Sequence, residues 1–161
     1  ETWRLALDVI HDEDDVWQCA LRLMAFVREH LTYQSNSTNV YTHMREVLAT
    51  RRGVCQDFAH VLLGLCRSLK IPALYVSGYL ATEKASATHA WVEIFVPGHR
   101  WQGLDPTNNC QTNETYVKLA VGRDYADVAP VRGTYKGTAD HVLSVDVKIQ
   151  KMESEETLTP P

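Results

Sequence analysis

The stretch from Arg51 to Leu69 constrains the fold more than any other part of this sequence. After Cys55 it is apolar on nearly every side of a helical projection, and a helix without a wide polar stripe has to be buried. The apolar positions are Phe58, Ala59, Val61, Leu62, Leu63, Leu65, Cys66 and Leu69. Pro72 ends the helix, because the residue before a proline is pushed out of the helical region. The sequence therefore predicts a central helix with the rest of the chain packed around it.

Cys55 falls at or just before the N-terminus of this predicted helix. Unpaired backbone N–H groups and the positive end of the helix dipole favour a thiolate at such a position. Gly53 precedes the cysteine, and Arg52, Gln56 and Asp57 give it a polar neighbourhood. This position suits a nucleophile.

A cysteine beside an apolar helix more often serves packing than chemistry, because an unmodified cysteine behaves as a small hydrophobe. Cys66 lies among leucines in the middle of the helix, and we interpret it as a core residue. Position alone leaves both roles open for Cys55. The remainder of the chain has to decide between them.

Size and composition are those of one ordinary globular domain. A chain of 161 residues can bury a sizeable core without staples. We place this domain at residues 1–150 and expect the acidic, proline-ended tail at 151–161 to be frayed or disordered. The net charge of −4 and the lack of a basic stretch argue against nucleic-acid binding. No run of apolar residues is long enough to predict a membrane span.

The cysteines and histidines give no metal signature. The four cysteines contain no C-x-x-C pair, and the seven histidines show no H-E-x-x-H spacing. We therefore expect neither a metal nor a cofactor. Reduced thiols suit the cytoplasm, which is the expected location, although the start at Glu1 suggests a trimmed N-terminus. The sequence leaves the oligomeric state open.

The first part of the chain reads as helical. Residues 2–10 fit either a helix or an extended lead-in. The acidic cluster at 12–15 precedes apolar residues spaced by three and four, which predicts an amphipathic helix ending near His30. Residues 32–40 are rich in Ser, Asn and Thr and indicate a loop. A short helix is expected at about 41–50.

Strand patterns follow Pro72. The predicted strands are 73–80, 88–96, 100–105, 116–121 and 141–149. Polar or small-residue loops are expected at 82–88, 107–115, 122–127 and 130–137. Helices first and a mainly antiparallel sheet afterwards give an α+β domain.

The hairpin formed by 88–96 and 100–105 makes a geometric prediction. His89 lies on one of its strands and Asp105 on the other. Because strand side chains alternate with a period of two, the two residues share a face only if the loop has an odd number of residues or a bulge. We predict such a loop, which places Asp105 opposite or diagonal to His89.

A cysteine nucleophile needs a base, and the base needs a partner that holds its tautomer and orientation. Cys55, His89 and Asp105 occur in that order. Alone, a strand histidine is usually structural, and an aspartate before proline usually ends a strand. Three separate structural explanations would be needed for one coherent set, and we therefore predict a catalytic triad.

Several motifs together resemble the bacterial transglutaminase-like superfamily, which includes candidate cysteine proteases. They are Gly-Val-Cys-Gln-Asp-Phe-Ala-His at 53–60, Val-Ser-Gly-Tyr at 76–79, His-Ala-Trp-Val-Glu at 89–93, Trp101 with Gly-Leu-Asp-Pro-Thr-Asn at 103–108, and Gly-Arg-Asp-Tyr-Ala-Asp-Val at 122–128. The resemblance covers roughly residues 33–147. It implies a papain-like fold, with Cys55 as nucleophile, His89 as general acid and base, and Asp105 as the orienting carboxylate. It also implies that an N-terminal β-rich region common in the family is missing from this chain.

The expected reaction passes through an acyl-thioester on Cys55 and acts on a protein or peptide substrate. The Cys55 N–H is the first candidate oxyanion donor, and Gln56, Gln34 or Tyr33 is the second. Trp91 shares the face of His89 and either walls the cleft or packs. Hydrolysis is preferred over amine transfer to a protein glutamine. A non-catalytic binding module on the same fold remains the third alternative.

Overall fold

The computed structural model describes residues 1–13, 15–81 and 88–129, together with positions 133, 136, 137, 147 and 149. Its helices are α1 (Thr2–Ile10), α2 (Val16–His30), α3 (Met44–Thr50), α4 (Cys55–Ser68) and α5 (Tyr125–Val128). Its strands are β1 (Thr32–Tyr33), β2 (Arg52–Gly53), β3 (Ala73–Leu80), β4 (Thr88–Val96), β5 (Arg100–Asp105), β6 (Cys110–Gln111) and β7 (Tyr116–Gly122). Most of the predicted strand at 141–149, most of the predicted loops at 82–88 and 130–137, and the tail at 151–161 lie outside the described residues.

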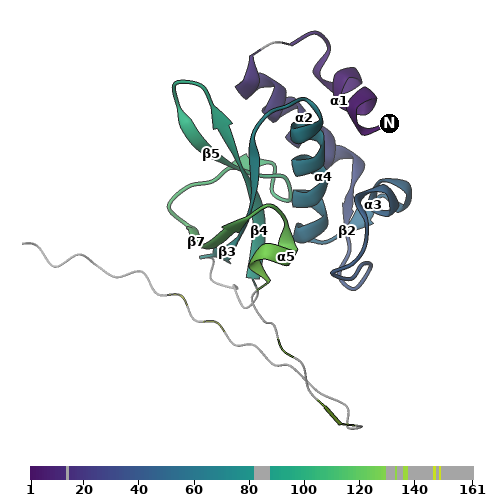
Figure 1. Cartoon of the computed structure of the whole chain (residues 1–161), viewed down its shortest axis with the longest axis vertical. Helices are drawn as coiled ribbons and strands as arrows, with labels where there is room; N and C mark the ends of the chain where they lie inside the picture. Colours follow the sequence, from purple (N-terminus) through teal and green to yellow (C-terminus); the bar gives the residue numbers. More distant parts are fainter. Residues whose placement is uncertain are drawn as a thin grey trace, which may run out of the picture.

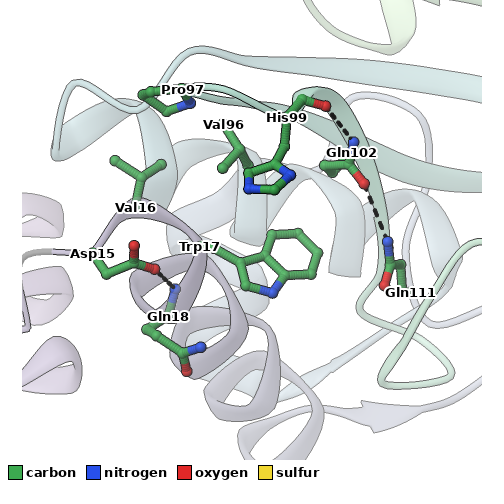
Figure 2. A pocket seen from close by; sticks show the side chains of 9 residues that line it. All are labelled: Asp15, Val16, Trp17, Gln18, Val96, Pro97, His99, Gln102 and Gln111. Atoms are coloured by element: carbon green, nitrogen blue, oxygen red, sulfur yellow. Dashed lines mark hydrogen bonds between the residues drawn. The ribbon is translucent and has the colours of Figure 1, made fainter.

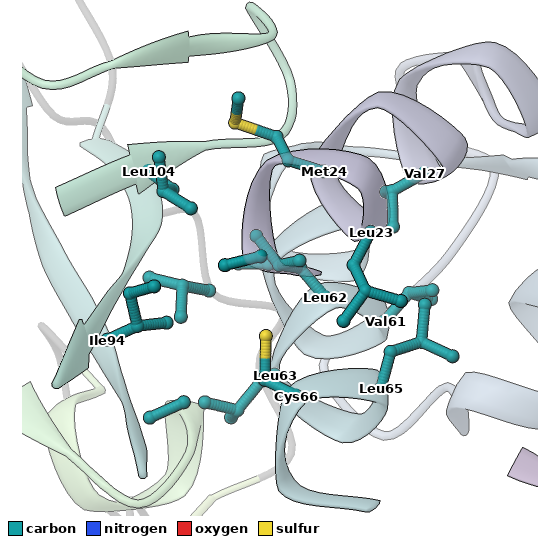
Figure 3. Close-up of a cluster of buried hydrophobic side chains, with 14 of the residues drawn as sticks. Leu23, Met24, Val27, Val61, Leu62, Leu63, Leu65, Cys66, Ile94 and Leu104 are labelled. Atoms are coloured by element: carbon teal, nitrogen blue, oxygen red, sulfur yellow. The ribbon is translucent and has the colours of Figure 1, made fainter. Parts of the chain in front are cut away.

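The helix predicted at the centre of the fold is α4, which lies between the sheet and helices α1, α2 and α3 (Figure 1). Leu62 and Leu65 are fully buried on it, and removing a leucine side chain from water stabilises a fold by about 2 kcal/mol. Leu23 and Val27 of α2 belong to the same core, as does Ile94 of β4 (Figure 3). The predicted burial of this helix is confirmed.

The large sheet is antiparallel, with strand order β6-β5-β4-β3-β7. One face carries residues such as Val92, Ile94 and Leu104, which pack against the helices. The other face carries His89, Trp91 and Asp105. The helices therefore cover one face of the sheet, and the site residues of β4 and β5 lie on the other. Cys55 at the start of α4 acts on His89 near the start of β4.

The β4–β5 hairpin has the odd loop that the sequence predicts. Val92 pairs with Leu104 and Val96 with Arg100, so that three residues, Pro97 to His99, form the turn. Gly98 adopts φ 80°, a conformation that favours glycine. Continuing this register places Asp105 opposite Trp91 and diagonal to His89 on the same face.

Several short elements differ from expectation. The predicted loop at 32–40 begins with β1, which pairs in parallel with β2, and the predicted loop at 107–115 contains β6. The short helix α3 begins at Met44 rather than near 41, and α5 lies in the predicted loop at 122–127. Residues 2–10, left undecided, are helical. The strand β1 forms through pairing with the remote β2, and β6 forms through pairing with β5; two residues are too few for periodicity to reveal.

Candidate active site

Cys55 is the first residue of α4, and its side chain is partly exposed. Asp57 fixes this end of the helix: its Oδ2 accepts from the Val54 N–H at 2.8 Å and from the Thr38 hydroxyl at 2.5 Å. The Asp57 side chain is almost fully buried. Gly53 has to be glycine, because a Cβ there would lie 2.6 Å from the Asp57 Cβ. The first turn is thus held rigidly, with the cysteine at its open end.

The β1–β2 pairing brings Tyr33 and Gln34 beside this turn. Tyr33 is paired with Gly53, and the Gln34 N–H donates to the Gly53 carbonyl at 2.9 Å. Burial and the negative charge of Cys55 raise the pKa of Tyr33. Gln34 is exposed, and Gln56 on the first turn of α4 is partly exposed.

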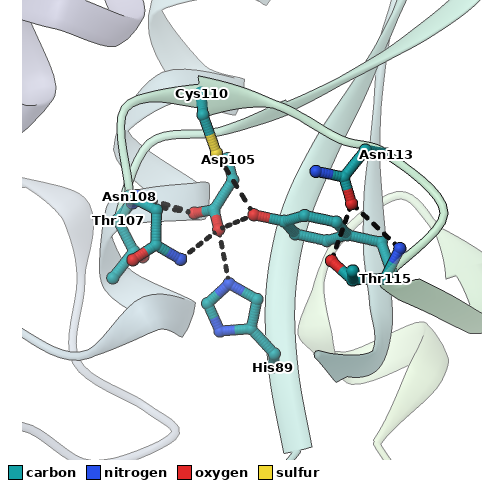
Figure 4. Close-up of polar contacts among 8 residues, drawn as sticks. His89, Asp105, Thr107, Asn108, Cys110, Asn113 and Thr115 are labelled. Carbon is teal, nitrogen blue, oxygen red and sulfur yellow. Dashed lines mark hydrogen bonds and ion pairs between the residues drawn. The ribbon is translucent and has the colours of Figure 1, made fainter. Parts of the chain in front are cut away.

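His89 lies between Cys55 and Asp105. Its Nε2 is 2.7 Å from Asp105 Oδ2, and its side chain is 13% exposed (Figure 4). Cys55 also interacts with this imidazole and raises the pKa of His89. Because Nε2 is occupied by the carboxylate, Nδ1 is the ring nitrogen left for another partner. The order sulfur, imidazole, carboxylate is the arrangement that nucleophilic catalysis by cysteine requires.

Asp105 is fully buried, and its carboxylate accepts five hydrogen bonds. Oδ1 accepts from the N–H groups of Thr107 and Asn108 at 2.8 and 3.2 Å. Oδ2 accepts from His89, from Asn108 Nδ2 at 2.6 Å and from the Tyr116 hydroxyl at 2.8 Å. A buried carboxylate is costly unless it is fully hydrogen-bonded, and this one is.

These contacts shift two pKa values in opposite directions. Burial lowers the pKa of His89, but the hydrogen bonds and charges of Asp105 and Cys55 outweigh it and raise the value to about 9. Burial raises the pKa of Asp105, but the hydrogen bonds from His89, Tyr116 and Asn108 outweigh it and hold the value below the ordinary range. His89 is therefore an imidazolium, and Asp105 a carboxylate, at neutral pH.

Trp91 lies beneath the histidine rather than on an open wall. Its side chain is 2% exposed, and its ring stacks against His89 with centroids 6.3 Å apart. Gly78, which pairs with His89, leaves room for it: a Cβ at Gly78 would lie 2.5 Å from Trp91 Cη2. The indole supports the position of the imidazole.

The family model for the transglutaminase-like superfamily matches residues 4–106. The chain belongs to the transglutaminase-like superfamily. The expected resemblance and the papain-like α+β fold are confirmed by this match together with a solved structure of 35% identity.

Two similar proteins match most of this transglutaminase-like domain. The uncharacterized protein Rv2569c of Mycobacterium tuberculosis is 41% identical over 138 residues, which cover 77% of this chain and 44% of that protein. The crystal structure of a candidate cysteine protease from Cytophaga hutchinsonii has a TM-score of 0.73, covering 79% of this chain and 43% of that one. The domain thus spans less than half the length of these relatives.

A third relative carries a named reaction. A protein-glutamine gamma-glutamyltransferase of Pseudomonas aeruginosa is 35% identical over 68 residues, which cover 36% of this chain and 10% of that enzyme. The chain is thus similar both to a candidate cysteine protease and, over a shorter stretch, to a protein-glutamine gamma-glutamyltransferase.

The transglutaminase-like domain also has a cavity of about 690 Å³ away from the triad. Trp17 of α2 and His99 of the hairpin turn line it, with Gln102 and Gln111 beside them (Figure 2). The hairpin turn is at the opposite end of β4 from His89.

Among the described residues no helix is long and apolar enough to span a bilayer. In the same part of the chain, no group of three His, Cys, Asp or Glu side chains is arranged to hold a metal ion.

Four residues of this site were not predicted from the sequence. They are Asp57, which accepts from the first turn of α4, and Asn108, Cys110 and Tyr116 around Asp105. Asp57 had a usable signal, since a carboxylate at the third position of a helix often returns to the N-cap N–H. Asn108 follows Asp105 by three residues, a spacing typical of a local turn. Tyr116 had no signal, because it reaches Asp105 from another strand.

Proposed function

We propose that this domain is a cysteine-dependent hydrolase of amide or peptide bonds that uses Cys55, His89 and Asp105 as a triad. The observation that carries the proposal is the 2.7 Å bond between His89 and the buried Asp105, on an imidazole whose pKa Cys55 also raises. The position of Cys55 at the N-terminus of α4 adds electrostatic support for a thiolate. The likeness to a candidate cysteine protease at 35% identity favours hydrolysis.

In the acylation step, the Cys55 thiolate attacks the carbonyl carbon of an amide. The tetrahedral intermediate collapses with cleavage of the C–N bond, and the His89 imidazolium gives its proton to the departing amine. This leaves an acyl-thioester on Cys55 and a neutral His89. Asp105 keeps the imidazole in the tautomer and orientation that both steps need.

In the second step, a water molecule gives a proton to neutral His89 and attacks the thioester carbonyl. The C–S bond breaks, the acid is released, and the thiolate–imidazolium pair is restored. The Cys55 backbone N–H is the proposed first oxyanion donor, because it belongs to the unpaired N-terminal groups of α4. Tyr33 is the favoured second donor, because its pairing with Gly53 brings it beside the first turn of α4 and its pKa responds to the charge of Cys55, whereas Gln34 and Gln56 have less support.

Amine transfer is the second candidate function. It shares the acyl-thioester and differs only in the acceptor, a primary amine instead of water. The local identity to a protein-glutamine gamma-glutamyltransferase is the observation that favours it. Protein or peptide glutamine would then be the acyl donor.

The deciding experiment incubates the domain with a peptide library, with and without a labelled primary amine, and follows the products by mass spectrometry. Cys55→Ala is the control. New peptide termini or deamidation that require Cys55 support the hydrolase, and amine incorporation without hydrolysis supports the transferase. Absence of all three products, combined with Cys55 alkylation no faster than that of an ordinary thiol, would leave the non-catalytic binding module as the function.

A further inference from the structure

Tyr116 lies at the start of β7 and reaches across the sheet to the triad. Its hydroxyl is 2.8 Å from Asp105 Oδ2, and its ring packs edge-on against Trp91 with centroids 5.3 Å apart. The same hydroxyl is 3.3 Å from Cys110 Sγ on β6. Tyr116 of β7 thus contacts Asp105 of β5, Cys110 of β6 and Trp91 of β4.

The direction of these hydrogen bonds follows from the chemistry of the groups. A carboxylate only accepts, so the phenolic O–H donates to Asp105. Burial and the neighbouring Cys110 and Asp105 raise the pKa of Tyr116, which keeps the hydroxyl protonated. Its one proton is therefore committed to Asp105, and the Cys110 thiol is the donor to the phenolic oxygen.

Asp105 Oδ2 is the oxygen that also accepts from His89. Each additional donor on that oxygen disperses its negative charge and weakens its hold on the imidazolium proton. We propose that Tyr116 is a positioning residue that sets how strongly Asp105 holds the proton of His89. This inference rests on the proposed function, because it assigns to Tyr116 a role in the same triad.

The sign of the effect can be stated. Tyr116→Phe keeps the ring against Trp91 and removes one donor from Asp105. The carboxylate becomes more basic and holds the imidazolium more strongly, so the pH at which His89 loses its proton rises. In the described part of the chain, the titratable groups that act on His89 and Asp105 are Cys55 and Tyr116, with Cys110 bonded to the Tyr116 hydroxyl, and only Tyr116 is changed.

The test measures two pH profiles in the wild-type domain and in Tyr116→Phe. One is the rate of Cys55 alkylation by iodoacetamide, followed on the Cys55 peptide by mass spectrometry. The other is the titration of the His89 ring by NMR. We expect the alkaline transitions of both profiles to move upward by about half a pH unit. The reason is that an Asp105 carboxylate with one donor fewer forms a stronger hydrogen bond with the His89 imidazolium. A purely structural tyrosine would leave both profiles unchanged, and that result would overturn the inference.

Cys110→Ala is the matched control, because it removes the other partner of the phenol and leaves every donor on Asp105. A shift less than half of that in Tyr116→Phe supports the inference, and an equal or larger shift would assign the effect to packing of the cluster and overturn it. If the phenylalanine variant does not fold, 3-fluorotyrosine at position 116 replaces it. That more acidic phenol donates more strongly, and the transitions should move downward; no movement or an upward one overturns the inference.

The failure of this inference is separable from that of the proposed function. A wild-type Cys55 that labels like an ordinary thiol and shows no coupling to His89 contradicts the triad itself. A wild-type profile with the expected coupling and an unchanged Tyr116→Phe profile contradicts only the role of Tyr116.

Discussion

The two ends of helix α4 each carry a cysteine, and they differ in every respect that matters for chemistry. Cys55, the first residue of the helix, is partly exposed and raises the pKa of His89. Cys66, three turns later, is fully buried, and burial raises its pKa to about 12. Both sit on one helix that is buried along most of its length.

The difference shows that the surroundings, not the residue type, decide what a thiol can do. At a helix N-terminus, unpaired backbone N–H groups and a neighbouring imidazolium favour negative charge on a sulfur. At the C-terminal end the sulfur is packed among Leu62, Leu63 and other apolar side chains, which stabilise no charge (Figure 3). A buried thiol there is a core residue, as the sequence predicts.

The largest expected effect is the loss of the nucleophile. Cys55→Ala should lower turnover of any amide substrate by at least about 10⁴-fold, since removing a triad nucleophile leaves only binding and oxyanion stabilisation. Its thermal unfolding should stay close to that of the wild type. Cys66→Ala should do the reverse, with turnover retained and a loss of about 1–2 kcal/mol in the free energy of unfolding. Turnover that survives in Cys55→Ala would remove Cys55 from the mechanism.

The second effect concerns reactivity in the folded state. Iodoacetamide should alkylate Cys55 at least about 100-fold faster than Cys66 at neutral pH, because alkylation needs an accessible thiolate. The measurement is time-resolved mass spectrometry of the two peptides. In denaturant the two rates should become equal, which is the internal control. Comparable native rates would mean that the two ends of the helix do not differ as described.

The third effect is the pH dependence of turnover. With a His89 pKa of about 9, the rate should fall roughly tenfold per pH unit above that value, because the leaving amine then lacks its proton donor. The pKa is raised by folding from an ordinary 6.5. The corresponding stability is therefore fully present below pH 6.5 and is lost as the pH rises through about 9. Rate and unfolding profiles measured together check both statements, and a rate that already falls at pH 7 would contradict them.

The smallest effect concerns the clamp on the first turn. Asp57→Ala leaves the Val54 N–H and the Thr38 hydroxyl without their acceptor and should cost about 2 kcal/mol of stability. Turnover should fall about tenfold, because Cys55 is then less firmly placed. Thr38→Ser keeps the hydroxyl and should change stability by less than about 0.5 kcal/mol. Unchanged stability in Asp57→Ala would show that other contacts hold the turn.

Much of the fold follows from local sequence pattern. The alternation along 88–96 and the run at 73–80 predict β4 and β3 with the bounds that the structure has. Pro97 to His99 as a three-residue loop places His89 and Asp105 on one face, because side chains alternate along a strand. The three residues of the predicted triad could be named for the same reason. Each residue type indicates its own chemistry, and their proximity depends on the register of one hairpin and the start of one helix. Their catalytic roles stay predictions.

The short strands that the sequence did not reveal form by pairing with other segments. The strands β1 and β6 have two residues each and exist only through their partners.

The sequence by itself determined which helix is buried, which strands alternate and which cysteine lies at a helix start, because these properties repeat along neighbouring residues. The tertiary structure alone decided that Asp105 is buried and that Tyr116, on another strand, donates to it. Each of these depends on where separate segments cross, and no periodicity records a crossing. The contacts made at those crossings shift the pKa values of His89 and Asp105.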